Sequence, residues 1–303
     1  MKLAIIIPYY KLTFFEATLN SLAVQTNQNF KVYIGDDASP ESPNDLLEKY
    51  QRKFNFEYHH FEENLGGTSL TQQWERCIAL SSNEEWIMIL GDDDVLGGNV
   101  VDAFYANLLE IEKEGINVVR FSTQKIDDEG KLISETYYHP RIEDSVDFLF
   151  RKTRSSLSEY AFKKEQVLKI GFKNFSLGWF SDILAVLEFS NFKNIFSVNT
   201  AKIYIRISNE SISGNDFNLK LKTKSTFDFY YFLLSKKSNL FSEKQKRELF
   251  SRVSKSYLND KKKINYFFKI SIISFKNNDF HQYCNFLLSV FRSLKISLNK
   301  LKI

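Results

Sequence analysis

Short apolar runs alternate with amphipathic segments through the first 122 residues, and this alternation restricts the fold more than any other feature. The run Leu3–Ile7 is apolar throughout and rich in β-branched residues, as expected for a strand buried on both faces. Strands that alternate with helices of roughly 10–15 residues are typical of βαβ units in a parallel sheet. We therefore predict an α/β protein. The predicted strands are 3–7, 30–34, 56–61, 86–90 and 118–122, and the predicted helices are 15–25, 45–54, 70–80 and 100–114.

The pattern changes after residue 122. Asp127-Asp128-Glu129-Gly130 predicts a hairpin turn. Beyond this turn we expect the sheet to become mixed, with further strands through Phe148 and at 160–162. Residues 165–169 then predict one helical turn closed by Gly171.

A change in charge predicts a domain boundary. Residues 1–215 carry 22 Lys and Arg against 31 Asp and Glu, whereas residues 216–303 carry 19 against 6. The basic segment also has helical periodicity, and Ser242-x-x-Gln245 is a capping box ahead of an apolar helix face. We predict an α/β domain at 1–215, with halves at about 1–100 and 101–215, and a basic helical region at 216–303.

The two cysteines, Cys77 and Cys284, are too few for a disulfide framework or a zinc site. The apolar run at the N-terminus is too short for the core of a signal peptide. No stretch of sequence approaches the ~18 apolar residues that a membrane span requires. These features predict a protein of the reducing cytoplasm.

Acidic clusters directly follow two of the predicted strands. They are Asp36-Asp37 and Asp92-Asp93-Asp94. A carboxylate in the middle of a buried strand would be costly to desolvate, but at a strand's carboxyl end it faces the crevice where open α/β sheets bind ligands. Oxygen ligands suit Mg²⁺ or Mn²⁺. The clusters therefore indicate a divalent cation that holds a phosphorylated substrate, and a solvated turn is the alternative.

Several common phosphate-binding motifs are absent from the sequence. The loop after the first predicted strand reads Pro8-Tyr9-Tyr10-Lys11, without G-x-G-x-x-G, and the chain has no G-x-x-x-x-G-K-[ST]. This argues against a dinucleotide site of the Rossmann type and against a P-loop NTPase. The basic C-terminal region has no nucleic-acid recognition motif, so we predict no nucleic-acid partner.

Five short motifs follow one another along residues 1–210. They are Ile5-Ile6-Ile7-Pro8-Tyr9-Tyr10, Ser21-Leu22-Ala23-Val24-Gln25-Thr26, Gly35-Asp36-Asp37-Ala38-Ser39, Asn64-Leu65-Gly66 and Leu90-Gly91-Asp92-Asp93-Asp94. In this order and at this spacing they resemble family 2 inverting glycosyltransferases. The resemblance implies a GT-A fold, a mostly parallel sheet flanked by helices, here with a C-terminal helical extension. It also implies a nucleotide-diphosphate sugar as the donor.

The resemblance assigns roles to residues at the donor end. It implies that Pro8 and Tyr10 lie along the nucleotide base, for which the family favours uridine. Asp37 would accept a hydrogen bond from the base, and Asp92 would accept one from the ribose.

The resemblance also implies that Asp93 binds Mn²⁺ or Mg²⁺, with the cation bridging the two phosphates. A divalent cation would stabilise the charge that develops on the leaving nucleoside diphosphate. Gly91 stands where the family's D-x-D motif has its first Asp. Which of Asp92, Asp93 and Asp94 is the direct ligand therefore stays open.

Asp182 matches the general base that family members place just before a helix. Inverting transfer needs one carboxylate to deprotonate the acceptor hydroxyl as it attacks the anomeric carbon. Apolar neighbours would raise the pKa of such a carboxyl group, which suits a base. Trp179 would stack on an acceptor sugar ring. The alternative for Asp182 is an N-cap of the helix 183–189.

Two arginines complete the candidate site. The resemblance implies that Arg206 reaches the donor diphosphate, whereas a strand-edge arginine is the alternative. Arg76 is displaced from the position where the family often carries an arginine. We interpret it as a surface charge on its helix, and contact with the base or a phosphate is the alternative.

We therefore predict a metal-dependent inverting glycosyltransferase that acts on a glycan or a lipid-linked acceptor, in surface polysaccharide synthesis. The alternative is a catalytically silent protein that binds nucleotide sugars on the same fold. A sugar nucleotidyltransferase would need a Gly-rich, Arg-bearing first loop, which Pro8-Tyr9-Tyr10 does not supply. For the basic region 216–303, two interpretations stay open: contact with an anionic membrane surface, and a soluble appendage packed on the catalytic domain.

Overall fold

The computed structural model describes residues 1–151, 155–208, 218–259, 263–276 and 280–300, with side chains placed through residue 293. The chain forms two compact units. One comprises Met1–Asn174 and Ser181–Asn215, and the other comprises Phe175–Phe180 and Asp216–Ile303. The sequence alone assigned Phe175–Phe180 to the α/β domain, whereas these six residues pack with the C-terminal helices.

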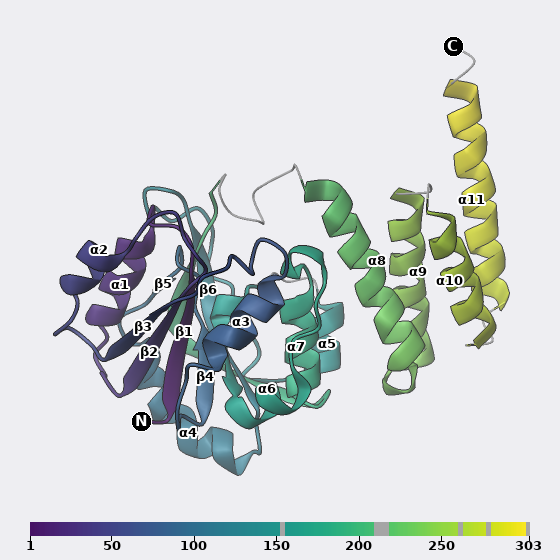
Figure 1. The fold of residues 1–303 in the computed structure, drawn as a ribbon. Coiled ribbons are helices and arrows are strands. Elements are labelled where there is room, and N and C mark those ends of the chain that lie inside the picture. The colour runs from purple at the N-terminus through teal and green to yellow at the C-terminus, as the bar shows by residue number, and fades with distance from the viewer. Residues whose placement is uncertain (152–154, 209–217, 260–262, 277–279, 301–303) are drawn as a thin grey trace. The chain divides into compact units, whose positions relative to one another are not determined.

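The first unit is built on one mixed sheet that has nine strands in the described residues, in the order β3-β2-β1-β4-β8-β6-β9-β5, with β7 paired to β9. Figure 1 labels β1 to β6. Strands β1 to β4 are parallel, and β8 runs antiparallel to both of its neighbours. The strands are β1 Leu3–Tyr9, β2 Phe30–Asp36, β3 Phe56–His60, β4 Trp86–Ile89, β5 Val95–Leu96, β6 Val118–Ile126, β7 Ile142–Asp144, β8 Tyr160–Lys163 and β9 Asn194–Arg206. The predicted α/β class is confirmed.

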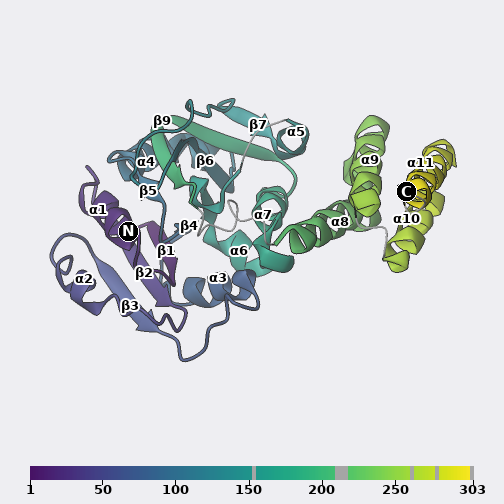
Figure 2. The same cartoon turned by 90° about the horizontal axis from the view of Figure 1, so that it is seen from above.

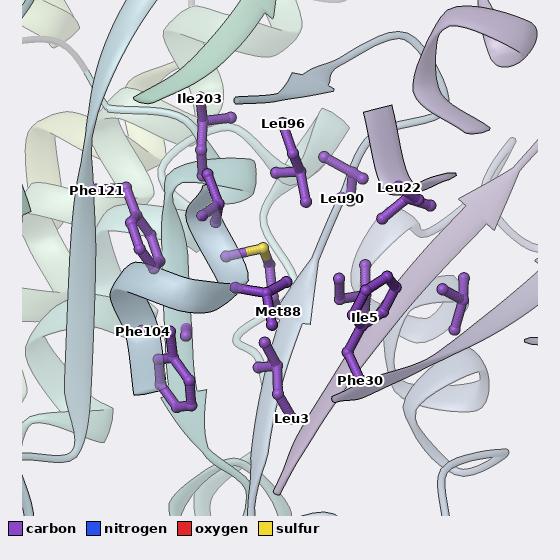
Figure 3. Close-up of a cluster of buried hydrophobic side chains, with 14 of the residues drawn as sticks. Leu3, Ile5, Leu22, Phe30, Met88, Leu90, Leu96, Phe104, Phe121 and Ile203 are labelled. Carbon is purple, nitrogen blue, oxygen red and sulfur yellow. The ribbon is translucent and has the colours of Figure 1, made fainter. Parts of the chain in front are cut away.

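Helices flank the sheet on both faces (Figure 2). They are α1 Phe15–Ala23, α2 Asn44–Glu48, α3 Leu70–Ile78, α4 Val100–Lys113, α5 Ser145–Phe150, α6 Lys164–Ile170 and α7 Ser181–Phe189. Because successive strand residues point to opposite faces, Leu3, Ile5 and Ile7 pack with α1, α2 and α4, as Figure 3 shows in part. Ala4 and Ile6 pack with α3, α5, α6 and α7 on the other face. The continuous apolar run of β1 thus fills two cores.

Most predicted elements are present with small shifts. Strand β1 continues through Pro8 to Tyr9, and α2 is about half as long as expected. The hairpin turn at 127–130 is confirmed by an antiparallel bridge between Ile126 and Leu132. The expected strand through Phe148 is wrong: this residue lies in α5, where Asp144 caps the helix by accepting hydrogen bonds from the N–H groups of Val146 and Asp147.

The sheet topology positions the acidic clusters. After β1 the chain forms β2 and β3 on one side of β1, and it then returns to form β4 on the other side. The carboxyl ends of β1 and β4 are therefore adjacent at a topological switch point, where open α/β sheets bind ligands. The loops that follow β1, β2 and β4 carry Tyr10, Asp37 and Asp92–Asp94.

The second unit is helical, as predicted. Its helices are α8 Leu219–Lys236, α9 Glu243–Asn259, α10 Ile264–Lys276 and α11 Phe280–Lys300 (Figure 1). The predicted capping box at the start of α9 is confirmed, since the Ser242 N–H donates to Gln245 Oε1 at 2.8 Å and the Gln245 N–H donates to Ser242 Oγ at 3.3 Å. The segment Phe175–Phe180 packs on α8, where the rings of Phe180 and Phe229 stack at 4.6 Å. Within the described residues, no helix has the length and apolarity of a membrane span.

Candidate functional site

Asp92 ties the loop after β4 to the loop after β1. Its Oδ2 accepts hydrogen bonds of 2.8 Å from the backbone N–H groups of both Tyr10 and Lys11. Burial and the neighbouring Asp93 raise the pKa of Asp92 to about 6. The two loops at the switch point are thus held together by a carboxylate and two main-chain donors. Pro8, at the end of β1, pairs with Gly35 on β2, and the Tyr10 side chain is exposed.

Asp94 is a structural residue of the same loop. Its carboxylate is buried and accepts hydrogen bonds from the Arg206 backbone N–H at 2.9 Å and from Ser158 Oγ at 2.5 Å. Ser158 Oγ in turn accepts a hydrogen bond from the Gly91 N–H at 3.0 Å. We call the loop between β4 and β5, residues 90–94, the acidic loop. Asp94 therefore joins the acidic loop to β9 and to the segment before β8.

Asp93 differs from both neighbours. Among the described residues, no other residue donates a hydrogen bond to its carboxylate, which is half-buried. Burial and the nearby Asp94 raise the pKa of Asp93 to about 7. A Cβ atom on Gly91 would lie 2.8 Å from Asp93 Oδ1, so the aspartate that the D-x-D motif places at this position would crowd that carboxylate. The positive charges of Arg206 and Lys11 lower the pKa of Asp93 by less than burial and Asp94 raise it, so this desolvated carboxylate suits binding of an external cation.

Arg206 holds the acidic loop from β9. Its Nε donates to the Asp93 carbonyl at 3.0 Å, and its Nη1 donates to the carbonyls of Asp127 at 2.6 Å and Asp128 at 3.1 Å. The guanidinium lies 4.4 Å from the centre of the Phe14 ring, and the residue is 4% exposed. The sequence predicted contact with the donor diphosphate. In the structure the guanidinium is engaged with main-chain carbonyls, which favours a positioning role.

Asp37 organises the loop between β3 and α3. Its carboxylate accepts hydrogen bonds from the N–H groups of Leu65 at 2.7 Å and Gly66 at 2.8 Å. It also pairs with Arg76, whose Nη2 donates to the Glu63 carbonyl at 2.7 Å. The interpretation of Arg76 as a surface charge is therefore wrong. Sequence spacing did not reveal the pair because Asp37 follows β2 whereas Arg76 lies on α3, 39 residues later.

The residue after Asp37 is in a strained conformation. Ala38 has φ of +52°, in the left-handed region that non-glycine residues rarely adopt. Such strain persists only where surrounding contacts impose it, and it is concentrated at functional sites.

Asp182 lies in the first turn of α7, inside the helix and not at its N-cap, so the cap interpretation does not hold. The hydroxyl of Ser155 donates to Asp182 Oδ2 at 3.2 Å, and the Ser155 and Tyr160 hydroxyl oxygens are 2.9 Å apart. Tyr160 is fully buried, and burial raises its pKa well above the usual value. Its phenol therefore remains protonated, and it donates to Ser155 while Ser155 donates to Asp182. Neither hydroxyl had a sequence signal.

The chain approaches α7 through a strained segment. Leu177 and Phe180 have φ of +64° and +71°, and Gly178 between them has φ of +63°. Trp179 lies in this segment and belongs to the second unit, where the Lys222 ammonium is 4.9 Å from its ring. Its indole is partly exposed. Trp179 and Asp182, which the sequence placed in one acceptor site, thus belong to different units.

The described residues contain no group of three or more His, Cys, Asp and Glu side chains that is arranged to hold a metal ion. Mg²⁺ is commonly bound by one or two carboxylates together with substrate phosphates. Asp93 fits that pattern, whereas Asp92 and Asp94 are occupied by main-chain and hydroxyl donors. A cation here would depend on the substrate for its remaining ligands.

Comparison with protein families gives one match that covers more than half of the chain. The sequence model described as glycosyl transferase family 2 matches residues 4–180. Among curated proteins, the chain is 29% identical over 128 residues to poly(ribitol-phosphate) β-N-acetylglucosaminyltransferase TarS of Staphylococcus aureus. This match covers 39% of the chain and 22% of TarS, so the chain spans about a fifth of the length of that relative.

Solved structures show the same fold. The structure of S. aureus TarS 1–349 in complex with UDP-GlcNAc superimposes with a TM-score of 0.64 at 16% identity, covering 86% of this chain and 73% of that one. The structure of GalNAc-T7 with UDP, GalNAc and Mn²⁺ superimposes with a TM-score of 0.53 at 11% identity, covering 87% of this chain and 57% of that one.

Proposed function

This chain belongs to glycosyl transferase family 2, and on that premise we propose that it transfers a sugar from a nucleoside-diphosphate sugar to an acceptor hydroxyl with inversion. One observation carries the proposal. Three successive aspartates follow β4 at the switch point of the sheet, and protein donors fix the carboxylates of Asp92 and Asp94, whereas in the described part of the chain no other residue donates to the carboxylate of Asp93.

The donor end of the proposed site comprises Pro8, Tyr10, Asp37 and Asp92. Tyr10 is exposed beside Asp92, so its ring is accessible to a base. Asp37 and Asp92 already accept two or three hydrogen bonds, and a carboxylate has about four acceptor positions, so each retains capacity for a base or a ribose. Uridine is the proposed base, in keeping with the UDP-GlcNAc bound by TarS.

Asp93 would hold Mn²⁺ or Mg²⁺ in this proposal. A bound cation would supply Lewis-acid stabilisation of the charge on the departing diphosphate. The protein's part is to fix Asp93, since Arg206 binds the Asp93 carbonyl and Asp94 anchors the next residue. The Mn²⁺ in the structure of GalNAc-T7 supports the choice of metal.

Asp182 is the proposed general base, which takes the proton of the acceptor hydroxyl as that oxygen attacks the anomeric carbon. Ser155 and Tyr160 are positioning residues, because their hydrogen bonds direct Oδ2 of Asp182. Trp179 is the proposed stacking residue for an acceptor sugar, and its partly exposed indole is compatible with this role.

The proposed acceptor is a glycan or a lipid-linked glycan of a surface polysaccharide. The poly(ribitol-phosphate) acceptor in the name of TarS supports a polymeric acceptor. We place the reaction in the cytoplasm, at the inner face of the membrane, because two isolated cysteines suit a reducing compartment and residues 216–303 are strongly basic.

The test is release of nucleoside diphosphate from a panel of nucleotide sugars with Mn²⁺ or Mg²⁺, for the wild type, Asp93→Asn and Asp182→Asn. Turnover of one donor, abolished by a chelator and by both substitutions, is the expected result. The competing function is a silent nucleotide-sugar-binding protein on the same fold. Metal-dependent UDP binding without turnover on any acceptor preparation would favour it, and absence of nucleotide binding would refute both.

A further inference from the structure

The two C-terminal helices expose apolar side chains where helices of a soluble protein usually expose polar ones. On α10, large apolar residues are exposed at Ile264, Phe268, Ile272 and Phe275, with exposed fractions of 55–69%. Their spacing places them along one side of the helix. The opposite side of α10 carries the residues that form the core of the unit, such as Ile270 at 0% exposure. The exposed stripe is therefore not needed to close that core.

Helix α11 repeats this arrangement. Phe280, Cys284, Leu288 and Phe291 are exposed at the same intervals of four, four and three residues, whereas Phe286 and Val290 are buried. The two helices lie side by side in both views (Figures 1 and 2). The ring centres of Phe275 and Phe280 are 5.7 Å apart, which joins the two stripes at the end where α10 meets α11. We call this surface the α10–α11 face; its exposed apolar residues are Ile264, Phe268, Ile272, Phe275, Phe280, Cys284, Leu288 and Phe291.

Positive charge accompanies the α10–α11 face. Residues 261–303 contain nine Lys and Arg and a single acidic residue, Asp279. Lys276 at the end of α10 and Arg292 beside Phe291 are both exposed. Large exposed apolar surfaces mark interaction sites, and the charge selects among partners. A second copy of the same face would bring like charges together, whereas an anionic surface would be attracted.

We propose that the α10–α11 face is the surface through which this protein binds an anionic lipid membrane. Exposed phenylalanines would enter the boundary between headgroups and acyl chains, while lysine and arginine side chains contact lipid phosphates. This inference deepens the proposed function by naming the surface that brings the enzyme to a membrane. It does not depend on which sugar is transferred.

The experiment is co-sedimentation of the full chain with two kinds of vesicle, phosphatidylcholine alone and equal parts of phosphatidylcholine and phosphatidylglycerol. Binding to the anionic vesicles only, weakened by added salt, is expected. One basic residue near such a surface contributes about 1 kcal/mol, so Lys276→Gln with Arg292→Gln should weaken binding by about 30-fold. The triple variant Phe268→Ser, Phe275→Ser, Phe291→Ser should weaken it at least ~10-fold.

A matched control separates this surface from general effects. Leu109 on α4 is 81% exposed and Lys131 is on an exposed turn, both in the first unit, so Leu109→Ser with Lys131→Gln should leave vesicle binding unchanged. UDP binding by each variant checks that the catalytic unit is intact, independently of the vesicle result. Absence of vesicle binding by the wild type, or equal binding by the triple variant, would overturn the proposal. An oligomer that the triple variant dissociates, without vesicle binding, would show that a second copy covers this face.

Discussion

The acidic loop after β4 and the first turn of α7 both present carboxylates, and main-chain N–H donors contribute to holding two of those in the acidic loop. In the acidic loop, Asp92 is fixed by two main-chain N–H groups and Asp94 by a main-chain N–H and a serine hydroxyl. At α7, the described contacts of Asp182 include a hydrogen bond from Ser155, which Tyr160 supports. Main-chain donors are fixed by the fold, whereas hydroxyl donors rotate.

This difference matches what the two ends of the proposed reaction require. A cation and a diphosphate need a site whose charges are held in place before binding, because preorganised groups cost no rearrangement during the reaction. A general base exchanges a proton in every cycle, and a hydroxyl donor can adjust to both protonation states. At α7, removal of a single side-chain hydroxyl should change the rate of transfer. At the acidic loop, a substitution should act by removing the charge of a carboxylate.

The largest effect is expected for Asp182→Asn. The amide cannot accept the acceptor's proton, and general-base catalysis typically contributes about 10²–10⁴-fold, so kcat should fall by that factor. UDP affinity, measured by calorimetry, should not change, because the acidic loop is untouched. A variant with wild-type turnover would remove Asp182 from the base role, and a variant that lost UDP binding would mean that the two regions are not independent.

The next effect concerns pH and the cation. The pKa of Asp93 is raised to about 7, so its carboxylate gains a proton as the pH falls through neutrality. Cations bind the deprotonated form, and Mn²⁺-dependent UDP affinity should fall by about 15-fold between pH 7 and pH 5.5. Asp93→Asn should bind UDP weakly at both pH values. A wild-type affinity that stays constant over this range would show that another group holds the cation.

A smaller effect is expected for Ser155→Ala. Loss of the hydroxyl removes a hydrogen bond to Oδ2 of Asp182, and kcat should fall by about 10-fold with KM for the donor unchanged. The lost hydrogen bond favoured the charged carboxylate, so the acid limb of the pH–rate profile should move to higher pH. Ser155→Thr, which keeps the hydroxyl, should restore both. If the alanine variant slowed the reaction without moving the acid limb, Ser155 would have only a structural role.

The sequence was sufficient to predict the fold because the elements near the site have strong local signals. A continuous apolar run defines β1, and carboxylates placed directly after β2 and β4 mark the crevice. The mispredicted strand through Phe148 had apolar residues compatible with either state, and the Asp144 cap decided for a helix.

The contacts that shape the site could not be predicted in the same way. Arg76 pairs with Asp37, 39 residues earlier, and Arg206 binds carbonyls at Asp93 and Asp127, more than 70 residues earlier. Such pairs depend on how segments that are distant in the sequence meet in the fold, and one sequence contains no periodicity that records this. Ser155 and Tyr160 were missed for the same reason, since hydroxyl residues are common in loops and strands alike.

The smallest expected effect is on stability. Most substitutions in a folded site lower the free energy of unfolding, whereas Asp93→Asn should raise it. An aspartate whose pKa is raised on folding binds its proton more tightly in the native state, so its ionisation begins to oppose folding once the pH exceeds the ordinary aspartate pKa of about 3.9 and does so fully above the folded pKa of about 7. Asp93→Asn should therefore raise the free energy of unfolding at pH 8 by on the order of 1–2 kcal/mol and leave it nearly unchanged at pH 3, where the carboxyl group is largely protonated in both states. Denaturant titration of the cation-free protein at both pH values measures this.

Asp94→Asn is the matched comparison, because its carboxylate accepts hydrogen bonds from the Arg206 N–H and Ser158, and its loss should destabilise the fold at pH 8. Equal destabilisation by the two variants would mean that the carboxylate of Asp93 is stabilised by internal contacts, as that of Asp94 is. The assignment of Asp93 to cation binding and of Asp94 to a structural role would then be wrong.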